Sequence, residues 1–249
     1  VPLMIETFAK KLEDVKDLPE KVVKEAVFGS QFHTICSGGA YLNPDYIELF
    51  ERFGIQILQG YGMTECSPVI STTVAWNVKK NSVGQLLPNC EAKTVDGELW
   101  VRGSSVMQGY YKMPEETKTA LKDGWLCTGD LGYVDEERFI YLTGRKKNLI
   151  ITKNGENVSP EELENKLSSS RLVQEVLVRE AKGVIEAEIY PDEEYAKKQG
   201  LEREEEVRVE LQKLIDEYNQ GAPAYKKIYS LIIREKEFEK TASRKIKRY

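Results

Sequence analysis

Two short apolar runs, at residues 34–37 and 55–58, each end in glycine and enclose a stretch with strong helix signals. Asn43 is a good N-cap, Pro44 suits the first helical position, and Gly54 is suited to end the helix. Strand, helix and strand in this order predict an α/β layer whose two strands are buried.

The texture of the sequence changes twice further along. After about residue 80, short strands between Gly and Asp turns predict a small, mostly antiparallel β element at about 82–143. From residue 146, strands and helices alternate and predict a compact α+β unit, in which Ser159 and Glu162 would form a capping box. The expected elements are helix 3–15, strands 98–101, 132–134 and 138–142, strand 149–152, helix 159–167, strands 174–179 and 184–190, helix 201–218 and strand 229–234. The predicted fold class is therefore α/β plus α+β, with domains at 1–145 and 146–249.

Charge and cysteine content exclude several classes of protein. The 249 residues carry a net charge of −5, which disfavours nucleic acid as a partner. The four cysteines form no CxxC pair and there is one histidine, so a Cys/His zinc site is not expected. Unpaired thiols point to the reducing cytosol, and no apolar run reaches the roughly 20 residues of a membrane-spanning helix. His33 lies in an apolar, strand-like stretch and is interpreted as a histidine of the core or its rim.

Two glycine-rich strings follow the first two predicted strands. At residues 37–40, SGGA lets a flat ligand or a phosphate approach the backbone closely, although glycines at strand ends often serve only to turn the chain. In QGYGMTE, at 59–65, the two glycines are expected to leave the ring of Tyr61 uncovered for stacking on an adenine. Thr64 offers a hydroxyl to a phosphate, and Glu65 offers a hard oxygen ligand to Mg²⁺.

Two further strings and the tail carry charge. TGD at 128–130 predicts a tight turn on which the Asp130 carboxylate can accept hydrogen bonds from two ribose hydroxyls, although such turns are common in any protein. GRKKN at 144–148 lies at the second change of texture, where Arg145 can reach a ribose or phosphate oxygen or remain solvated with its neighbours. The tail at 240–249 holds five Lys or Arg and no acid, so it is either a solvated end or the source of a phosphate-binding lysine.

In this order the strings resemble those of the adenylate-forming superfamily, and most of all the long-chain fatty acyl-CoA synthetases. The resemblance runs from about Phe32 to Tyr249 and rests on SGGAYL, QGYGMTECSPVI, GELWVRGSSVMQGYYKMPEET, GWLCTGD, GRKKNLIITKNGENVSPEELE and KTASRKIKRY. It implies that a carboxylate attacks ATP to give an acyl-adenylate and pyrophosphate, and that coenzyme A then displaces AMP. The implied fold is the C-terminal portion of a large AMP-binding domain with a β-barrel-like subdomain, followed by a mobile α+β lid.

The resemblance also implies which residues would bind the nucleotide. Thr64 would hold the α-phosphate, and Asp130 would clamp the ribose hydroxyls with help from Arg145. The implied nucleotide-binding set is Gly38, Gly39, Ala40, Gly60, Tyr61, Gly62, Thr64, Asp130 and Arg145.

Four further roles are implied by the same comparison. Glu65 would bind Mg²⁺, and Lys245 would be the catalytic lysine of adenylation, acting with Thr64 and Glu65. Lys147 matches the hinge about which the lid rotates, and Gly155 matches the glycine along the pantetheine arm of coenzyme A.

The sequence departs from the family pattern in two places. Arginine stands before Lys245 where the family has glycine, and the proline before Lys240 is absent. The register of the residues at 246–248 still points to Lys245 as the catalytic lysine, and Lys240 is the lesser candidate. The phosphate-binding loop rich in Ser, Thr and Gly does not occur, which predicts a fragment that keeps the adenosine side of the site.

Several other functions stay open from the sequence. They are an acyl-AMP ligase that loads a carrier protein, an aryl or amino-acid adenylating enzyme, a non-catalytic module that binds AMP or acyl-AMP, and a purely structural α/β protein. The expected partners are a carboxylic acid, ATP and coenzyme A. A cytoplasmic location is expected, and contact with a membrane surface is compatible with the sequence although no segment requires it.

Overall fold

The computed structural model describes residues 2–15, 17–241 and 245–248. It divides the chain into two compact units, Val1–Leu142 and Thr143–Tyr249. The division falls at 142/143, where the sequence predicted 145/146. Among the helices of the described residues, none combines the length and hydrophobicity that crossing a bilayer requires.

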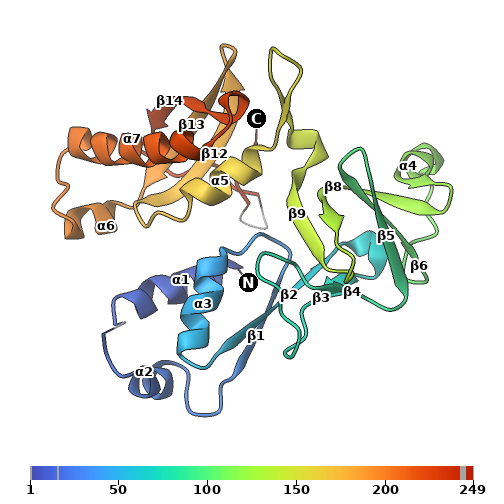
Figure 1. Cartoon of the computed structure of the whole chain (residues 1–249), viewed down its shortest axis with the longest axis horizontal. Coiled ribbons are helices and arrows are strands. Elements are labelled where there is room, and N and C mark those ends of the chain that lie inside the picture. The colour runs from blue at the N-terminus through green and yellow to red at the C-terminus, as the bar shows by residue number, and fades with distance from the viewer. Residues whose placement is uncertain (1, 16, 242–244, 249) are drawn as a thin grey trace. The chain divides into compact units, whose positions relative to one another are not determined.

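The first sheet of the first unit contains the strand–helix–strand segment that the sequence predicts. Its strand order is β1 (Thr34–Gly38), β2 (Gln56–Gly62), β3 (Val69–Thr72) and β4 (Gln85–Leu86). β1 and β2 are parallel, as expected for strands joined through a helix, and β3 and β4 add antiparallel strands. Three helices accompany this sheet in Figure 1: α1 (Pro2–Glu13), α2 (Glu20–Val27) and α3 (Pro44–Arg52).

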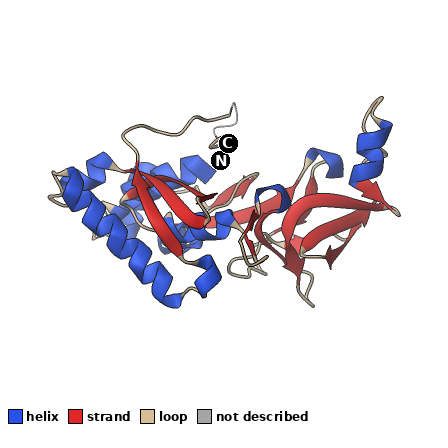
Figure 2. Cartoon of the chain, turned by 90° about the horizontal axis from the view of Figure 1, so that it is seen from above, coloured by secondary structure: helices blue, strands red, loops and turns tan. Residues whose placement is uncertain are grey.

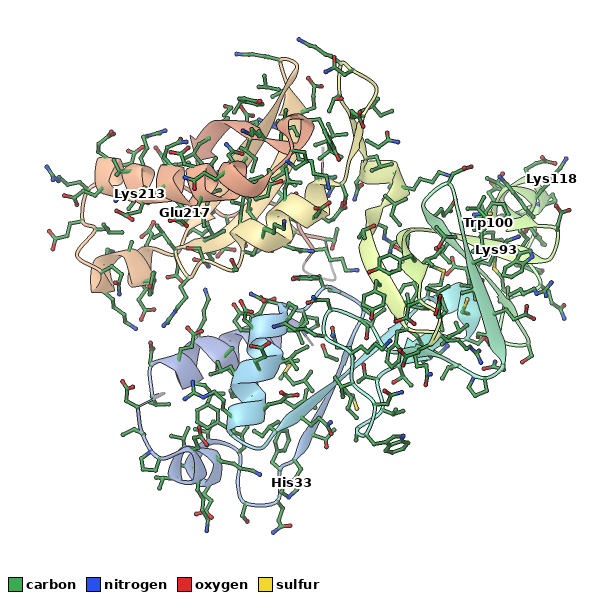
Figure 3. All side chains as sticks on the ribbon, in the orientation of Figure 1. His33, Lys93, Trp100, Lys118, Lys213 and Glu217 are labelled. Carbon is green, nitrogen blue, oxygen red and sulfur yellow. The ribbon has the colours of Figure 1, made fainter. Side chains whose placement is uncertain are left out.

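Helix α3 begins as its sequence predicts. The Asn43 side chain accepts a hydrogen bond from the Asp45 backbone N–H at 2.9 Å, and Pro44 occupies the first turn. The helix buries Leu49 and Phe50 in a core that joins α1 to the sheet. His33 precedes β1 and is exposed, with Nδ1 3.1 Å from the Lys24 ammonium (Figure 3), so of the two expected positions, core or rim, the core is wrong.

The second sheet of this unit is the predicted antiparallel β element, and its strands curl in Figure 2. It contains β5 (Cys90–Val95), β6 (Glu98–Gly103), β8 (Trp125–Val134) and β7 (Leu121–Lys122) in this order, with β9 (Ile140–Arg145) paired to β8. A short helix, α4 (Pro114–Ala120), precedes β7. One face of the sheet packs into a core with Cys66 and Ile70, and the other face carries Lys93 and Trp100 (Figure 3).

The second unit is an α+β domain, as predicted. Its main sheet has the order β12 (Val173–Ala181), β13 (Val184–Pro191) and β14 (Ile228–Ile233), with β12 antiparallel and β14 parallel to β13. Helices α5 (Pro160–Leu167) and α7 (Glu204–Gly221) share one core with these strands. The remaining elements are η2 (Lys146–Asn148), β10 (Ile150–Ile151), β11 (Asn157–Val158), α6 (Glu193–Lys198) and η3 (Ala224–Lys226).

One local expectation in this unit needs correction, and one helix was not foreseen. Ser159 is the N-cap residue of α5, but its hydroxyl donates to the Thr143 carbonyl at 2.7 Å and makes no cap bond, so the predicted capping box is absent. Helix α6 was not predicted at all, because six residues hold too little apolar periodicity to stand out. Its N-cap, Asp192, accepts from the Tyr195 backbone N–H at 3.0 Å.

Candidate functional site

The glycine-rich strings meet at one edge of the first sheet. Gly38 lies opposite Gly60 in the parallel register of β1 and β2. Parallel strands end at the same edge, which is where open α/β sheets bind ligands. Gly39 and Ala40 form an exposed bend after β1, and η1 (Thr64–Cys66) follows β2. The structure therefore brings these two strings together.

Ser37 presents a buried hydroxyl just before this edge. Its side chain is 5% exposed, and its Oγ has no hydrogen-bond partner among the residues that the structure describes. Buried hydroxyls are normally paired with protein or with a bound molecule. Nearby, a Cβ added at Gly39 would meet nothing within 4 Å, so the backbone there is open to approach. The edge therefore presents accessible backbone at Gly39, while the Ser37 hydroxyl lies beneath the surface.

A hydrogen bond joins this edge to the second sheet. Tyr61 Oη donates to Asp130 Oδ2 at 2.6 Å, and both side chains are buried, at 8% and 5% exposure. The expectation that the flanking glycines leave the Tyr61 ring uncovered is therefore wrong for this structure, because the ring packs in the core between the two sheets. Gly62 is required by packing, since a Cβ there would lie 1.8 Å from the Pro68 carbonyl oxygen.

Asp130 lies on a β-bulge within β8 and not on the tight turn that the sequence predicts. The register between β6 and β8 shifts here, so that residues 128–130 face the single residue Leu99. Gly129 has a φ of +70°, a conformation that favours glycine, and its N–H donates to Glu98 Oε1 at 2.8 Å. Bulges change the direction in which a strand presents its side chains, and this one presents Asp130 to Tyr61.

Glu65, the expected magnesium ligand, is half-buried in η1 beside the exposed Thr64. Its Oε1 accepts a hydrogen bond from Tyr110 Oη at 2.8 Å, which raises the pKa of Tyr110 because the carboxylate stabilises the protonated phenol. The described residues contain no cluster of three or more His, Cys, Asp or Glu that could hold a metal by themselves. Mg²⁺ is commonly bound by one or two carboxylates together with substrate phosphates, so a lone Glu65 fits that mode.

The remaining predicted site residues belong to the second unit. Arg145 ends β9, Lys147 lies in η2, and both are exposed. Gly155 has a φ of +80° in the exposed turn between β10 and β11. Lys245 is exposed in the tail. The predicted site residues thus belong partly to the first unit and partly to the second.

The two candidate lysines of the tail differ in their surroundings. Lys240 Nζ lies 2.5 Å from Glu175 Oε1 and 2.6 Å from Glu237 Oε2, and these hydrogen bonds raise the pKa of Lys240. Its ammonium is therefore engaged inside the second unit. Lys245 is exposed, whereas Lys240 is partly buried.

Two family models match this chain. A model of AMP-binding enzymes matches residues 1–111, and a model of the C-terminal domain of AMP-binding enzymes matches residues 147–249. The chain belongs to the AMP-binding enzyme family. The resemblance drawn from its motifs is therefore confirmed.

Relatives of this AMP-binding chain include long-chain-fatty-acid–CoA ligases. One of Mycobacterium bovis is 39% identical over 171 residues, which cover 68% of the chain and 28% of the relative. One of Bacillus subtilis is 38% identical over 163 residues, which cover 60% of the chain and 29% of the relative. The chain spans less than a third of the length of either protein.

Solved structures confirm the predicted fold class. The o-succinylbenzoate coenzyme A synthetase of Bacillus subtilis in complex with AMP matches with a TM-score of 0.75 and 28% identity, covering 98% of the chain and 48% of that structure. The adenylation domain of a Mycobacterium chelonae carboxylate reductase shares the fold, with a TM-score of 0.80 and 22% identity over 98% of the chain and 43% of that structure.

Three residues in or beside the candidate site were not singled out from the sequence. Ser37 stood inside a quoted string, and only its burial without a partner draws attention to it. Glu98 shapes the bulge from 31 residues away, and Tyr110 reaches Glu65 from 45 residues away. Neither long-range pair has a local sequence signal that could have revealed it.

Proposed function

We propose that this chain supplies the adenosine-binding edge and the C-terminal domain of an ATP-dependent acyl-CoA ligase that acts on a long-chain fatty acid. The observation that carries the proposal is the buried Tyr61–Asp130 hydrogen bond at the edge where the two glycine strings meet. It holds a carboxylate in a fixed direction, which suits a group that accepts hydrogen bonds from ribose hydroxyls. The long-chain ligases among the relatives support the fatty acid as substrate.

The proposed reaction has two steps. In the first, a carboxylate oxygen of the acid bonds to the α-phosphorus of ATP while the bond to pyrophosphate breaks. Thr64 and Lys245 would stabilise the negative charge that develops on the phosphate and carboxylate oxygens. Mg²⁺ bound at Glu65 would neutralise charge on the phosphates. In the second step, the sulfur of coenzyme A bonds to the acyl carbon and AMP leaves.

The proposed mechanism divides the two steps between two orientations of the C-terminal domain. Lys147 lies in η2, close to the division between the units, and is the proposed hinge. Gly155 offers an exposed turn without a side chain along which the pantetheine arm of coenzyme A would lie. In the whole protein that contains this chain, Lys147→Pro should spare acyl-adenylate formation and cripple thioester formation. Equal loss of both steps would contradict the hinge.

A second candidate substrate class is an aryl acid. A 4-coumarate–CoA ligase-like protein of rice is 41% identical over 165 residues, covering 59% of the chain and 30% of the relative. A panel of fatty and aryl acids, each supplied with ATP and either coenzyme A or a carrier protein, separates these substrates and acceptors.

The four cysteines are unpaired, which suits the reducing cytoplasm as the proposed location.

The adenosine site can be tested on this chain directly. Titration calorimetry should show saturable binding of a non-hydrolysable fatty acyl-adenylate analogue, and no binding of the matching guanosine compound. Asp130→Ala should abolish the binding, and Glu91→Ala, an exposed carboxylate on β5, should leave it unchanged. Binding that ignores the base or survives Asp130→Ala would refute the proposed site.

A further inference from the structure

The tail that carries Lys245 is folded back on itself in the second unit. The Thr241 N–H donates to the Lys245 carbonyl at 2.8 Å, and the Lys245 N–H donates to Thr241 Oγ1 at 3.2 Å. Lys240 and Ile246 form a β-bridge beside them. The residues on either side of 242–244 are thus two short antiparallel stems, and Lys245 begins the returning stem.

The outgoing stem is attached to the sheet through Glu175 of β12. Glu175 Oε2 accepts the Phe238 backbone N–H at 2.8 Å, and its Oε1 pairs with Lys240. The Phe238 side chain is buried at 4% exposure, which adds an apolar anchor to the polar one. This side of the hairpin is therefore fixed before the chain reaches Thr241.

The returning stem is attached through Arg248, three residues after Lys245. The Arg248 guanidinium donates to Glu164 Oε2, lies 3.5 Å from Glu161 Oε1, and donates to the Val178 carbonyl at 3.5 Å. Glu164 accepts the Val178 backbone N–H with its other oxygen at 2.7 Å. Arg248 therefore ties the end of the tail to both α5 and β12.

The burial of the Glu164 carboxylate means that breaking its pair with Arg248 would be costly. The Glu164 side chain is 12% exposed and that of Arg248 is 26% exposed. An isolated two-stranded hairpin is marginal in water, so the short returning stem depends on an anchor of this kind. Replacing Arg248 would leave the charge of the buried Glu164 carboxylate uncompensated. It would also remove the guanidinium that holds the returning stem.

We propose that Arg248 is a positioning residue for Lys245. By fixing the returning stem to α5 and β12, it holds the Lys245 backbone in one place relative to the body of the second unit. With its backbone fixed, the side chain of Lys245 can reach only a small set of positions, whereas a flexible tail would let it reach many more. This inference rests on the proposed function, in which Lys245 serves the adenylation step.

The test uses the whole protein that contains this chain and measures the two half-reactions separately. Adenylation is followed by carboxylate-dependent exchange of pyrophosphate into ATP, and thioester formation is started from preformed acyl-adenylate. Arg248→Gln should slow adenylation by roughly tenfold to hundredfold, the scale of a misplaced catalytic group. It should change thioester formation by less than about twofold, a split that general damage to the unit would not give. Arg248→Lys, which keeps the charge, should recover part of the rate.

A double variant and a neighbouring cation complete the design. In a Lys245→Ala background, Arg248→Gln should cause no further loss, because a positioning residue has nothing left to position. Lys247→Gln, which removes an exposed pair with Glu239, should behave like the unaltered protein. Additive losses in the double variant, or equal losses in both half-reactions, would overturn the inference. An unchanged adenylation rate in Lys245→Ala alone would instead refute the proposed role of Lys245.

A structural measurement on the chain itself guards against simple misfolding. Hydrogen exchange followed by mass spectrometry should show faster exchange in peptides that cover residues 239–248 of Arg248→Gln, with unchanged protection in α7. Loss of protection across α7 as well would mean that Arg248 supports the fold of the whole unit and not the tail alone.

Discussion

Asp130 owes its position to Glu98, a residue that carries no role in any motif. Glu98 is 5% exposed, accepts the Gly129 N–H at 2.8 Å, and accepts Trp100 Nε1–H at 3.2 Å. The bond to Gly129 lies at the β-bulge between β6 and β8. The shape of the site at Asp130 therefore depends on a carboxylate that need not touch the ligand.

Glu98→Gln should show this dependence. Replacing the carboxylate by an amide weakens a charge-assisted bond to Gly129, and we expect a loss of about 1–3 kcal/mol in the free energy of unfolding. Binding of the acyl-adenylate analogue should weaken as well, which calorimetry on the same samples will show. Glu91→Gln, an exposed carboxylate paired with Arg102, is the matched control and should change neither quantity.

Tyr110→Phe tests the second long-range contact. Without its hydroxyl the Glu65 carboxylate loses one fixed hydrogen bond, which for this solvent-exposed pair contributes on the order of 1 kcal/mol. We expect weaker magnesium-dependent binding of ATP to the whole protein, measured by calorimetry across a magnesium series. Tyr111→Phe offers a neighbouring tyrosine that is 85% exposed, and it should leave the magnesium dependence unchanged.

These residues also mark what the sequence could and could not predict at this scale. The candidates Tyr61, Glu65 and Asp130 were singled out from their strings and supported by resemblance, and the structure brings Tyr61 and Asp130 into contact. The burial of the Tyr61 ring and the bulge under Asp130 arise from pairing between strands far apart in sequence. Local patterns of glycine and polarity carry no information on such pairing.

At the scale of elements, prediction succeeded where a segment contains its own signals. Helix α3 has an N-cap, an early proline and a terminal glycine, so its limits were readable. The glycines of β8 led to the prediction of a turn followed by a short strand, whereas the structure has one continuous strand. Glycine within a strand can also mark a bulge. The residue type alone could not distinguish the two cases.

Helix α7 offers a test of packing at this scale. Leu211 is fully buried between Val207 and Ile215 on the inner face of the helix. Leu211→Ala should destabilise the second unit by about 2–5 kcal/mol, because it leaves a cavity in that core. Val209→Ala, on the same helix but 46% exposed, should cost far less.

Urea unfolding can assign this loss to the correct unit. All three tryptophans, Trp76, Trp100 and Trp125, lie in the first unit, so tryptophan fluorescence reports on that unit and circular dichroism on both. Leu211→Ala should shift the circular dichroism transition and leave the fluorescence transition in place. A matching shift in fluorescence would show that the two units unfold as one.

At the scale of the whole molecule, each unit has a core of its own, and the pair Lys79–Asp135 is among the ion pairs that link distant segments of the first unit. Lys79 Nζ lies 2.8 Å from Asp135 Oδ2, and Asp135 Oδ1 accepts the Phe139 N–H at 2.9 Å. The hydrogen bond from Lys79 is the main cause that lowers the pKa of Asp135 from its ordinary value of 3.8. The contribution of Asp135 to stability is therefore complete above about pH 3.8 and is lost as the pH falls through its lower folded pKa.

Asp135→Asn should reveal this pH dependence. The variant should be less stable than the unaltered chain at neutral pH, and the difference should begin to shrink as the pH falls below about 3.8, toward the lower pKa of Asp135 in the folded chain. Urea unfolding followed by tryptophan fluorescence between pH 7 and roughly pH 3 measures both chains under the same conditions. A difference that stays constant over this range would mean that the carboxylate does not act through its charge.

The strand order of the second unit has a consequence for how this unit is made. β12 and β13 are joined by the two-residue turn Lys182–Gly183, and such hairpins form within about 1–10 μs. β14 pairs with the other edge of β13 only after α6, α7 and their connections have closed a long loop. During synthesis the edge of β13 that pairs with β14 therefore stays unpaired until β14 has left the ribosome. The interval before β14 arrives is the time at which the nascent unit is most exposed to aggregation and to capture by chaperones.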